Sequence, residues 1–245
     1  MTLPAKAFQR WLQGVAPEAS TADVCRISGI KRTTLAQQLV RGKVSVTTVV
    51  SISRAYGINP VAALADFEAY RQLADPQPPP TRWELVSQIS TADLLGAVLA
   101  RPALDPGREA GDEPPVLSPA PHATSVKNWV EAIDDGEVRH RVSAATGIAP
   151  QNYSAQLTAN RLTAELAVAT ARAAGVGLTG GLVATGLVTE EEAGWAPGAR
   201  RAALASLSDG DLAVLAGDRL QALGKVLRRQ EQDQAQTEKI WENLG

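Results

Sequence analysis

The segment STADVCRISGIKRTTLAQQLVRG (residues 20–42) contains the start and stop signals of two short helices separated by a tight turn. Ser20 is a typical N-cap because its hydroxyl can accept a hydrogen bond from an amide of the first helical turn, and Gly29 is typical of a helix end. The second helix is expected over about Arg32 to Val40, and Gly42 follows its last turn. The segment therefore predicts two helices joined by a short turn.

Three further helices are expected around this pair. One precedes it, at about Ala7 to Val15, and contributes aromatic residues to the core. Ser45 is expected to cap a helix rich in buried valines, which Gly57 ends. Asn59 and Pro60 supply an N-cap and a proline at the first helical position, so a fifth short helix begins there.

The chain also aligns with itself at an offset of 118 residues, without a gap from Trp11 to Arg101. The identical pairs include Trp11/Trp129, Gly29/Gly147, Gln38/Gln156, Arg54/Arg172, Gly57/Gly175 and Ser90/Ser208. This period is far longer than that of a solenoid repeat, so each copy is expected to be a unit of domain size.

The five-helix pattern resembles the DNA-binding domain of the Cro/C1 (XRE-like) helix-turn-helix family. The resemblance is carried by Val24–Ile30, Thr34–Leu35, Leu39–Lys43 and Ile52–Pro60. The chain departs from the family pattern in that the two leucines of the third helix, Leu35 and Leu39, are four positions apart where three are common. The resemblance covers about 60 residues of each copy and implies sequence-specific binding of double-stranded DNA, most like that of a temperate-phage immunity repressor.

These observations predict an all-α protein with two tandem helix-turn-helix modules, each followed by a helical hairpin, and a Pro-rich linker between the copies. The expected divisions are module 1 (residues 1–74), the hairpin of copy 1 (75–101), the linker (102–121), module 2 (122–192), and the hairpin and C-terminal helix of copy 2 (193–245). The hairpin of copy 1 splits at Ser90 and cannot bury its apolar side alone. Three partners are open: its own module, the other copy, or a second chain.

The net charge of −2 conceals a local basic segment, since six basic residues and no acidic residue lie between Val24 and Ala65. In a helix-turn-helix domain, side chains at the start of the recognition helix reach base edges while nearby cations hold phosphates. For copy 1 the resemblance implies that Arg32, Thr33, Thr34 and Gln37 read bases and that Lys31, Arg41 and Lys43 contact phosphates.

The same positions of copy 2 carry less positive charge. Its candidate DNA contacts are Gln151, Asn152, Asn160 and Arg161. Two interpretations are open: module 2 binds DNA, or it has become a packing partner that forms a pseudo-dimer with module 1.

The last helix of copy 2 is expected to run on from Asp209 through a leucine-rich part into a Gln-rich tail that ends at Ile240, Trp241 and Leu244. A polar tail of this kind is usually an extension surrounded by solvent. The apolar residues at its end make self-association through this helix the alternative.

Other function classes find little support. One cysteine and two histidines exclude a disulfide framework and a zinc set, so no metal, no cofactor and no enzymatic activity are expected. Cys25 is interpreted as a small buried hydrophobe, whereas His122 and His140 have no obvious partner. No apolar run approaches the roughly 18 residues of a membrane span, and no secretory signal is recognised at the N-terminus. We therefore expect a cytoplasmic, nucleoid-associated protein without a membrane partner.

The sequence thus predicts a DNA-binding transcriptional regulator of the repressor class that uses one or both modules on double-stranded DNA. An antitoxin or a host regulator of the same fold is one alternative. A helical protein-interaction adaptor that binds no DNA is the other, and the basic segment of copy 1 argues against it.

Overall fold

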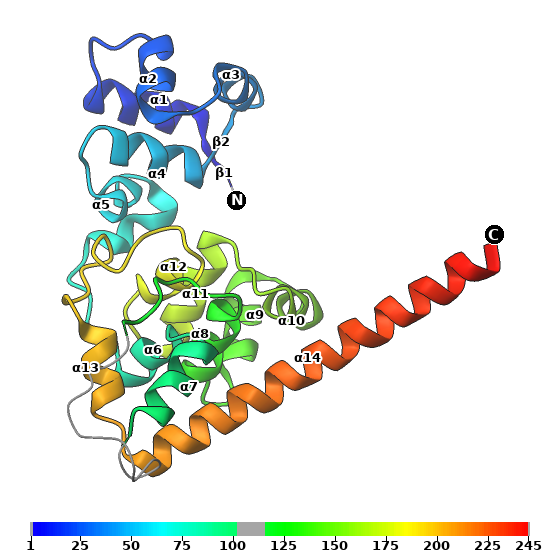
Figure 1. Ribbon diagram of the computed structural model, residues 1–245. Coiled ribbons are helices and arrows are strands. Elements are labelled where there is room, and N and C mark those ends of the chain that lie inside the picture. Colours follow the sequence, from blue (N-terminus) through cyan, green and yellow to red (C-terminus); the bar gives the residue numbers. More distant parts are fainter. Residues whose placement is uncertain (1, 102–115, 245) are drawn as a thin grey trace. The chain divides into compact units, whose positions relative to one another are not determined.

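The computed structural model describes residues 2–101 and 116–244, with side chains up to residue 237. The protein is predominantly helical, which confirms the predicted fold class (Figure 1). None of the described helices is long and apolar enough to cross a lipid bilayer.

The chain divides into two compact units. Unit 1 consists of Met1–Gln88 with Pro119–Arg200, and unit 2 consists of Ile89–Ser118 with Arg201–Gly245. Unit 1 therefore contains both of the predicted modules, which pack together as one compact body.

Module 1 contains the five predicted helices and one further short helix. They are α1 (Ala5–Val15), α2 (Thr21–Ser28), α3 (Arg32–Val40), α4 (Val46–Ala55), α5 (Pro60–Ala65) and the 3₁₀ helix η1 (Glu68–Ala74). The predicted N-caps form, because the side chains of Ser20, Ser45 and Asn59 each accept a backbone amide of the first turn. Gly29 ends α2 in the left-handed conformation, with φ of 70°.

A small antiparallel sheet was not predicted from the sequence. It pairs β1 (Thr2–Pro4) with β2 (Lys43–Ser45), and Leu3 lies opposite Val44. Both of these side chains are buried, so the sheet closes one side of the module 1 core and holds the segment that follows α3.

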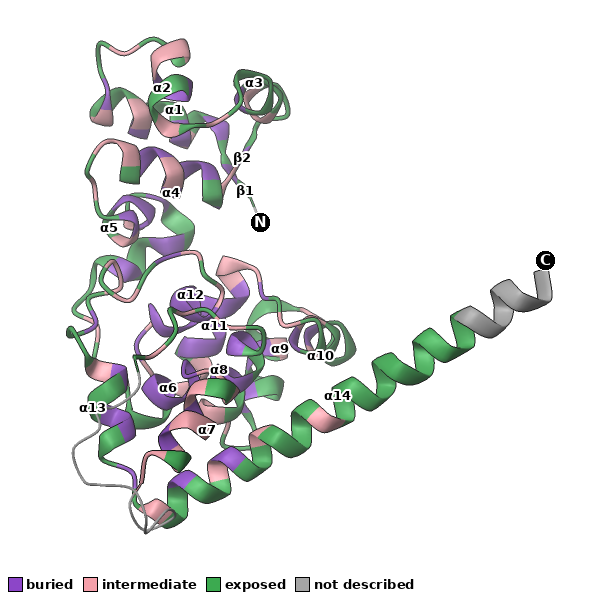
Figure 2. Ribbon diagram, viewed as in Figure 1, coloured by how far each residue is buried: buried purple, intermediate pink, exposed green. Residues whose placement is uncertain are grey.

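The core of module 1 is built around three aromatic residues. Phe8 and Trp11 of α1 have ring centroids 5.8 Å apart, and Phe67 lies 5.9 Å from Trp11. Figure 2 shows the buried residues gathered on the inner faces of the helices of this module. Such aromatic packing lets a module of this size bury a continuous apolar core.

Module 2 contains α8 (Ser125–Ile133), α9 (Val138–Thr146), α10 (Pro150–Thr158), α11 (Ala164–Ala174) and α12 (Gly180–Ala184). A helix of copy 1, α6 (Arg82–Ser87), packs against α8. It begins with a capping box formed by Thr81 and Glu84. Three packing partners were left open for this segment from its sequence, and α6 packs against the other copy.

Unit 2 contains α7 (Thr91–Leu99), most of α13 (Ala199–Ala205) and α14 (Asp209–Leu244). Leu94 of α7 and Leu212 of α14 are fully buried where these two helices pack. The guanidinium of Arg101 donates to the backbone carbonyls of Leu204 and Leu207 and pairs with Asp209 at 3.1 Å. The end of α7 is thereby held at the start of α14.

The predicted hairpin of copy 1 (75–101) is therefore divided between the two units, because α6 buries its apolar face against α8 and α7 buries its own against α14. Most of the predicted linker, residues 102–115, lies outside the described residues. The same applies to the side chains of Ile240, Trp241 and Leu244 at the end of α14.

The structure shows the surroundings of Cys25 and His122. Cys25 is buried, as expected of a small hydrophobe. The expectation that His122 lacks a partner was wrong, since its Nε2 lies 3.0 Å from the carbonyl oxygen of Ser87. This histidine joins the chain before α8 to the end of α6.

Candidate nucleic-acid interface

Helix α3 is held in place by its inner face, which leaves its outer face in solvent. Leu35 is fully buried beneath the helix. The side-chain oxygen of Gln38 accepts hydrogen bonds from the amide of Ser45 (2.9 Å) and the hydroxyl of Thr48 (3.0 Å) at the start of α4. The predicted base-reading residues Arg32, Thr33, Thr34 and Gln37 are all exposed.

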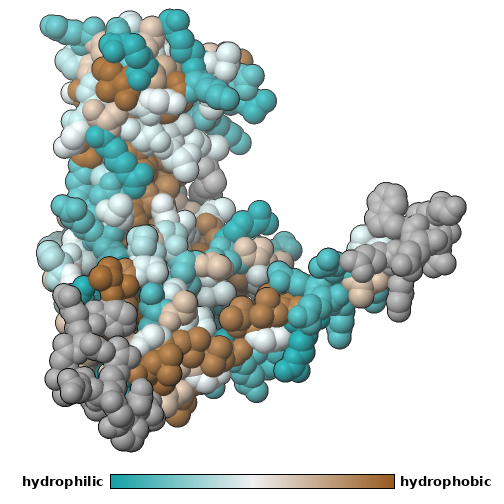
Figure 3. All heavy atoms as spheres, in the orientation of Figure 1, coloured by the Kyte–Doolittle hydropathy of each residue, from teal (hydrophilic) through white to brown (hydrophobic). Residues whose placement is uncertain are grey.

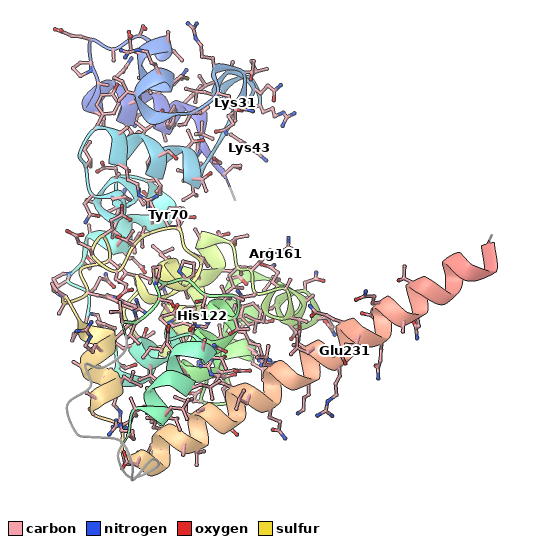
Figure 4. All side chains as sticks on the ribbon, viewed as in Figure 1. Lys31, Lys43, Tyr70, His122, Arg161 and Glu231 are labelled. Atoms are coloured by element: carbon pink, nitrogen blue, oxygen red, sulfur yellow. The ribbon has the colours of Figure 1, made fainter. Side chains whose placement is uncertain are left out.

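The basic residues near α3 divide into two groups. Arg26 pairs with Asp23, and Arg54 pairs with Glu192, so neither contributes an uncompensated charge. In the described part of the chain the other four basic residues of the segment make no ion pair: Lys31, Arg32, Arg41 and Lys43. Figure 4 shows Lys31 and Lys43 on the right-hand side of unit 1, where α3 lies.

The N-terminus of α3 has no side-chain cap. Lys31 occupies the N-cap position and makes no capping hydrogen bond, whereas the preceding and following helices are capped by Ser20 and Ser45. The first amides of a helix point away from its end and carry partial positive charge, which suits them to a phosphate oxygen. Together with the neighbouring cations, this helix end is electropositive.

Helix α10 of module 2 repeats this arrangement with different side chains. Tyr153 and Leu157 are buried beneath it, and the Tyr153 hydroxyl lies 2.8 Å from that of Thr170 in α11. Gln151 and Asn152 are exposed on the outer face. The N-cap position is Ala149, so this helix also begins without a side-chain cap.

Asn160 is used within the fold. Its side-chain oxygen accepts the amides of Val126 (2.9 Å) and Lys127 (3.2 Å) at the start of α8. Its backbone has φ of 49°, a left-handed conformation that asparagine tolerates better than most residues. Asn160 therefore caps α8 with its side-chain oxygen and forms the turn after α10, and the DNA contact predicted for it stays a prediction.

The positive charge of module 2 is low. Arg139 pairs with Asp134, and Arg141 pairs with Asp135 at 2.9 Å. Arg161 is exposed, and Figure 4 shows it on the same side of unit 1 as Lys31 and Lys43. The two helices thus present unequal surfaces, a strongly basic one at α3 and a nearly neutral polar one at α10.

Two residues that fix the site were missed from the sequence. Gln38 anchors α3 to α4, and its identity with Gln156 at the 118-residue offset was the available signal. Arg54 joins the modules, and nothing near it in the sequence indicates its partner Glu192. Hydrogen bonds from the Arg54 guanidinium hold the pKa of the Glu192 carboxyl below its usual value.

Comparisons with protein-family models, with curated proteins and with solved structures find no match to this chain. The residues and their geometry therefore carry the functional argument.

Proposed function

We propose that this chain is a sequence-specific, double-stranded DNA-binding transcriptional regulator of the repressor class, with α3 as a recognition helix. The observation that carries the proposal is the outer face of α3. Four exposed side chains able to bind base edges lie there among cations that make no ion pair within the described residues.

The chemistry of these side chains suits the major groove. An arginine can donate two hydrogen bonds to a guanine edge, and a glutamine can bind an adenine edge in the same way, so Arg32 and Gln37 supply base discrimination. Lys31, Arg41 and Lys43 supply phosphate contacts, which set register and affinity. Gln38 and Leu35 hold the helix in place, so DNA binding costs little conformational entropy in α3.

Module 2 is proposed as a second, weaker reader. Gln151 and Asn152 retain hydrogen-bonding groups for base edges, and Arg161 retains one phosphate contact. An antitoxin or a host regulator would use the same surfaces, and the sequences that the chain selects distinguish these roles. An adaptor that binds only proteins gives no reason for four cations around α3 that form no ion pair in the described part of the chain.

Self-association through α14 is a separate part of the proposal, with a second copy of the chain as the partner. Beyond its buried start, the exposed leucines Leu220, Leu223 and Leu227 follow one another at spacings of three and four residues. Figure 3 shows hydrophobic side chains gathered over α7 and the first half of α14. A seam of this spacing is self-complementary between helices, as in coiled coils.

Selection from random duplexes tests the DNA-binding proposal. The intact chain is mixed with a random library at about 0.15 M salt, and the affinity for enriched duplexes is compared with that for scrambled ones by fluorescence anisotropy. We expect a preference of about 10³-fold or more. Failure to enrich any sequence, or equal affinity for enriched and scrambled duplexes, would contradict the proposal. The proposed site of action is the DNA of the cytoplasmic nucleoid.

A further inference from the structure

Equivalent residues of the two modules of unit 1 lie beside the opposite module. Arg54 of module 1 donates from Nη2 to the carbonyl oxygen of Leu187 of module 2, at 3.0 Å. The repeat offset of 118 residues relates Arg54 to Arg172 and Leu187 to Ala69. Arg172 lines a groove of module 2 to which module 1 contributes Ala69.

Two grooves of unit 1 are lined by equivalent residues of the α4 and α11 segments. One groove, of about 520 Å³, places Leu187 of module 2 against Ser45, which caps α4, and the α4 residues Thr47, Val50, Ser51 and Arg54. The other, of about 740 Å³, is lined by residues of module 2 and by Ala69 of module 1, and its module 2 residues include Thr163, which caps α11, and the α11 residues Glu165, Val168, Ala169 and Arg172. Each residue of the first set has its 118-offset equivalent in the second.

An exchange of this kind identifies the symmetry that relates the modules. Suppose that each module carries two patches, A and B. If patch A of module 1 contacts patch B of module 2, and patch A of module 2 contacts patch B of module 1, the two modules are related by a two-fold rotation. A head-to-tail translation would use each patch only once. The placement of Arg54 beside Leu187, and of Ala69 in the groove that Arg172 lines, is what an approximate two-fold relation between modules 1 and 2 requires.

We propose that the chain is a covalent pseudo-dimer that reads two unlike half-sites arranged as an inverted repeat at one fixed spacing. This inference rests on the proposed DNA-binding function and adds the orientation and spacing of its site. A two-fold relation between recognition helices requires half-sites in inverted orientation. Figure 1 shows α3 and α10 both at the right-hand edge of unit 1.

The half-sites differ because the side chains at equivalent positions differ. Arg32 of α3 corresponds to Pro150 of α10, and Gln37 corresponds to Ala155. The half-site of α3 therefore supplies most of the bidentate base contacts, while that of α10 is read with fewer. One chain then binds an asymmetric sequence that a symmetric homodimer would not prefer.

Direct contacts between the modules fix the spacing. Glu192 receives hydrogen bonds of 2.6 and 2.7 Å from Arg54, and its backbone carbonyl accepts one from Asn59. The amide of Leu178 donates to the side-chain oxygen of Gln77 at 2.9 Å. Modules joined in this way cannot adjust to half-sites that are moved along the duplex.

A series of duplexes tests the inference with the intact chain. The sequence enriched by selection is divided into its two half-sites, which are rejoined in inverted or direct orientation at spacings changed one base pair at a time. We expect one inverted arrangement to bind at least about tenfold more tightly than every direct repeat and than an inverted site displaced by about half a helical turn. Equal affinity for direct and inverted repeats, or equal affinity across all spacings, would overturn the inference while leaving selective DNA binding in place. Absence of any enriched sequence would instead remove the proposed function itself.

A pair of variants tests the source of the fixed spacing. Glu192→Ala removes the acceptor of Arg54, whereas Glu191→Ala changes an exposed neighbour whose side chain makes no hydrogen bond or ion pair among the described residues. We expect Glu192→Ala to reduce the discrimination between spacings severalfold while Glu191→Ala retains it. Circular dichroism of both variants verifies that they are folded. Unchanged discrimination in a folded Glu192→Ala chain would contradict the role of this contact.

Discussion

The indole nitrogen of Trp129 donates a hydrogen bond of 3.2 Å to Oε1 of Glu84, a residue of copy 1 that lies in the core of module 2. Both side chains are buried, with 0% of Trp129 and 1% of Glu84 exposed. The other carboxylate oxygen of Glu84 accepts the amide and the hydroxyl of Thr81. Module 2 is therefore completed by a helix that the sequence assigns to the preceding copy.

Removal of this carboxylate is expected to destabilise unit 1. Glu84→Ala leaves the buried indole N–H of Trp129 without an acceptor and removes the capping box, so the free energy of unfolding should fall by about 2–3 kcal/mol. Glu84→Gln is the matched control, because the amide oxygen can still accept from the indole. Denaturant unfolding measures both variants, and equal losses in the two would show that the hydrogen bond to Trp129 contributes little.

Because of the ion pair between Arg54 and Glu192, we expect the free energy of unfolding to depend on pH in the acidic range. Because Arg54 lowers the pKa of Glu192 below the ordinary value of 4.5, the stabilisation is complete above that value and is lost as the pH falls through the lower, folded-state pKa. Glu192→Gln should therefore cost about 1 kcal/mol at neutral pH, and the cost should shrink as the pH falls through the lowered pKa of Glu192, because the wild-type carboxyl then also becomes neutral. Urea unfolding at neutral pH and at an acidic pH checks this, with Glu191→Gln as the control. A difference that is the same at both pH values would exclude the charge as its cause.

Two buried tyrosines are expected to respond oppositely to loss of the hydroxyl. Within the described residues the hydroxyl of Tyr70 makes no hydrogen bond, whereas that of Tyr153 lies 2.8 Å from the Thr170 hydroxyl. Tyr70→Phe should leave the free energy of unfolding unchanged or raise it by about 1 kcal/mol, and Tyr153→Phe should lower it by about the same amount. A clear loss of stability in Tyr70→Phe would show that its hydroxyl has a partner.

Tyr70 also predicts a response to alkali. Burial, with a contribution from the nearby charge of Glu165, raises the pKa of Tyr70 to about 12, so its neutral form stabilises the fold. That stabilisation is complete below the ordinary tyrosine pKa of about 10 and is lost as the pH rises toward 12. Thermal unfolding of wild type and Tyr70→Phe between these values should show a shallower decline for the variant. An equal decline of stability with pH in both proteins would show that ionisation of Tyr70 does not cause it.

The helices of module 1 were predictable because each carries its own local signals. Ser20, Ser45 and Asn59 cap helices by accepting hydrogen bonds from amides two or three residues away. Both partners of each contact therefore lie in one short stretch of sequence. The α3 boundaries agree with the prediction for the same reason. The exposure of the predicted base-reading side chains follows from the position of Leu35 on the opposite face.

The arrangement of the modules was not predictable from such signals. Hydrogen bonds between Arg54 and Glu192 join residues 138 apart, and neither residue has a neighbour that indicates the other. The sheet depends likewise on Leu3 and Val44, whose pairing spans most of module 1. The capping role of Asn160 was not predictable either, because a polar side chain after a helix has the same appearance in sequence whether it faces a ligand or caps another helix.

Substitutions around α3 should separate base reading from charge. Arg32→Ala is expected to weaken binding of the preferred site by about 1–3 kcal/mol and to relax the preference at one base pair. Lys43→Ala should weaken binding to all sequences alike and reduce the salt slope by about one. Arg71→Ala is the control, since this exposed arginine of η1 is already paired with Glu68. Wild-type affinity in both test variants would show that α3 is not the reader.

Truncation should reveal whether α14 mediates assembly. The exposed fractions of Leu220 and Leu223 are 43% and 42%, values large for leucines without a partner, and Figure 2 shows most of the described helix exposed. A chain that ends after Gly224 is expected to lose any self-association that the intact chain shows in sedimentation. Leu220→Gln with Leu223→Gln should do the same, and Gln221→Ala should not. Monomers at every concentration that binds DNA would leave the internal duplication as the only pairing device.

Retention of genomic DNA tests the central claim most directly. Fragments of the source genome are incubated with the intact chain in excess nonspecific competitor, and the retained fragments are identified after a gel shift. We expect that a small set of fragments with a shared sequence is retained, and that this set is lost when Arg32 and Gln37 are both replaced by alanine. Uniform retention of all fragments, no retention, or the same set retained by the double variant would contradict a sequence-specific DNA-binding function for α3.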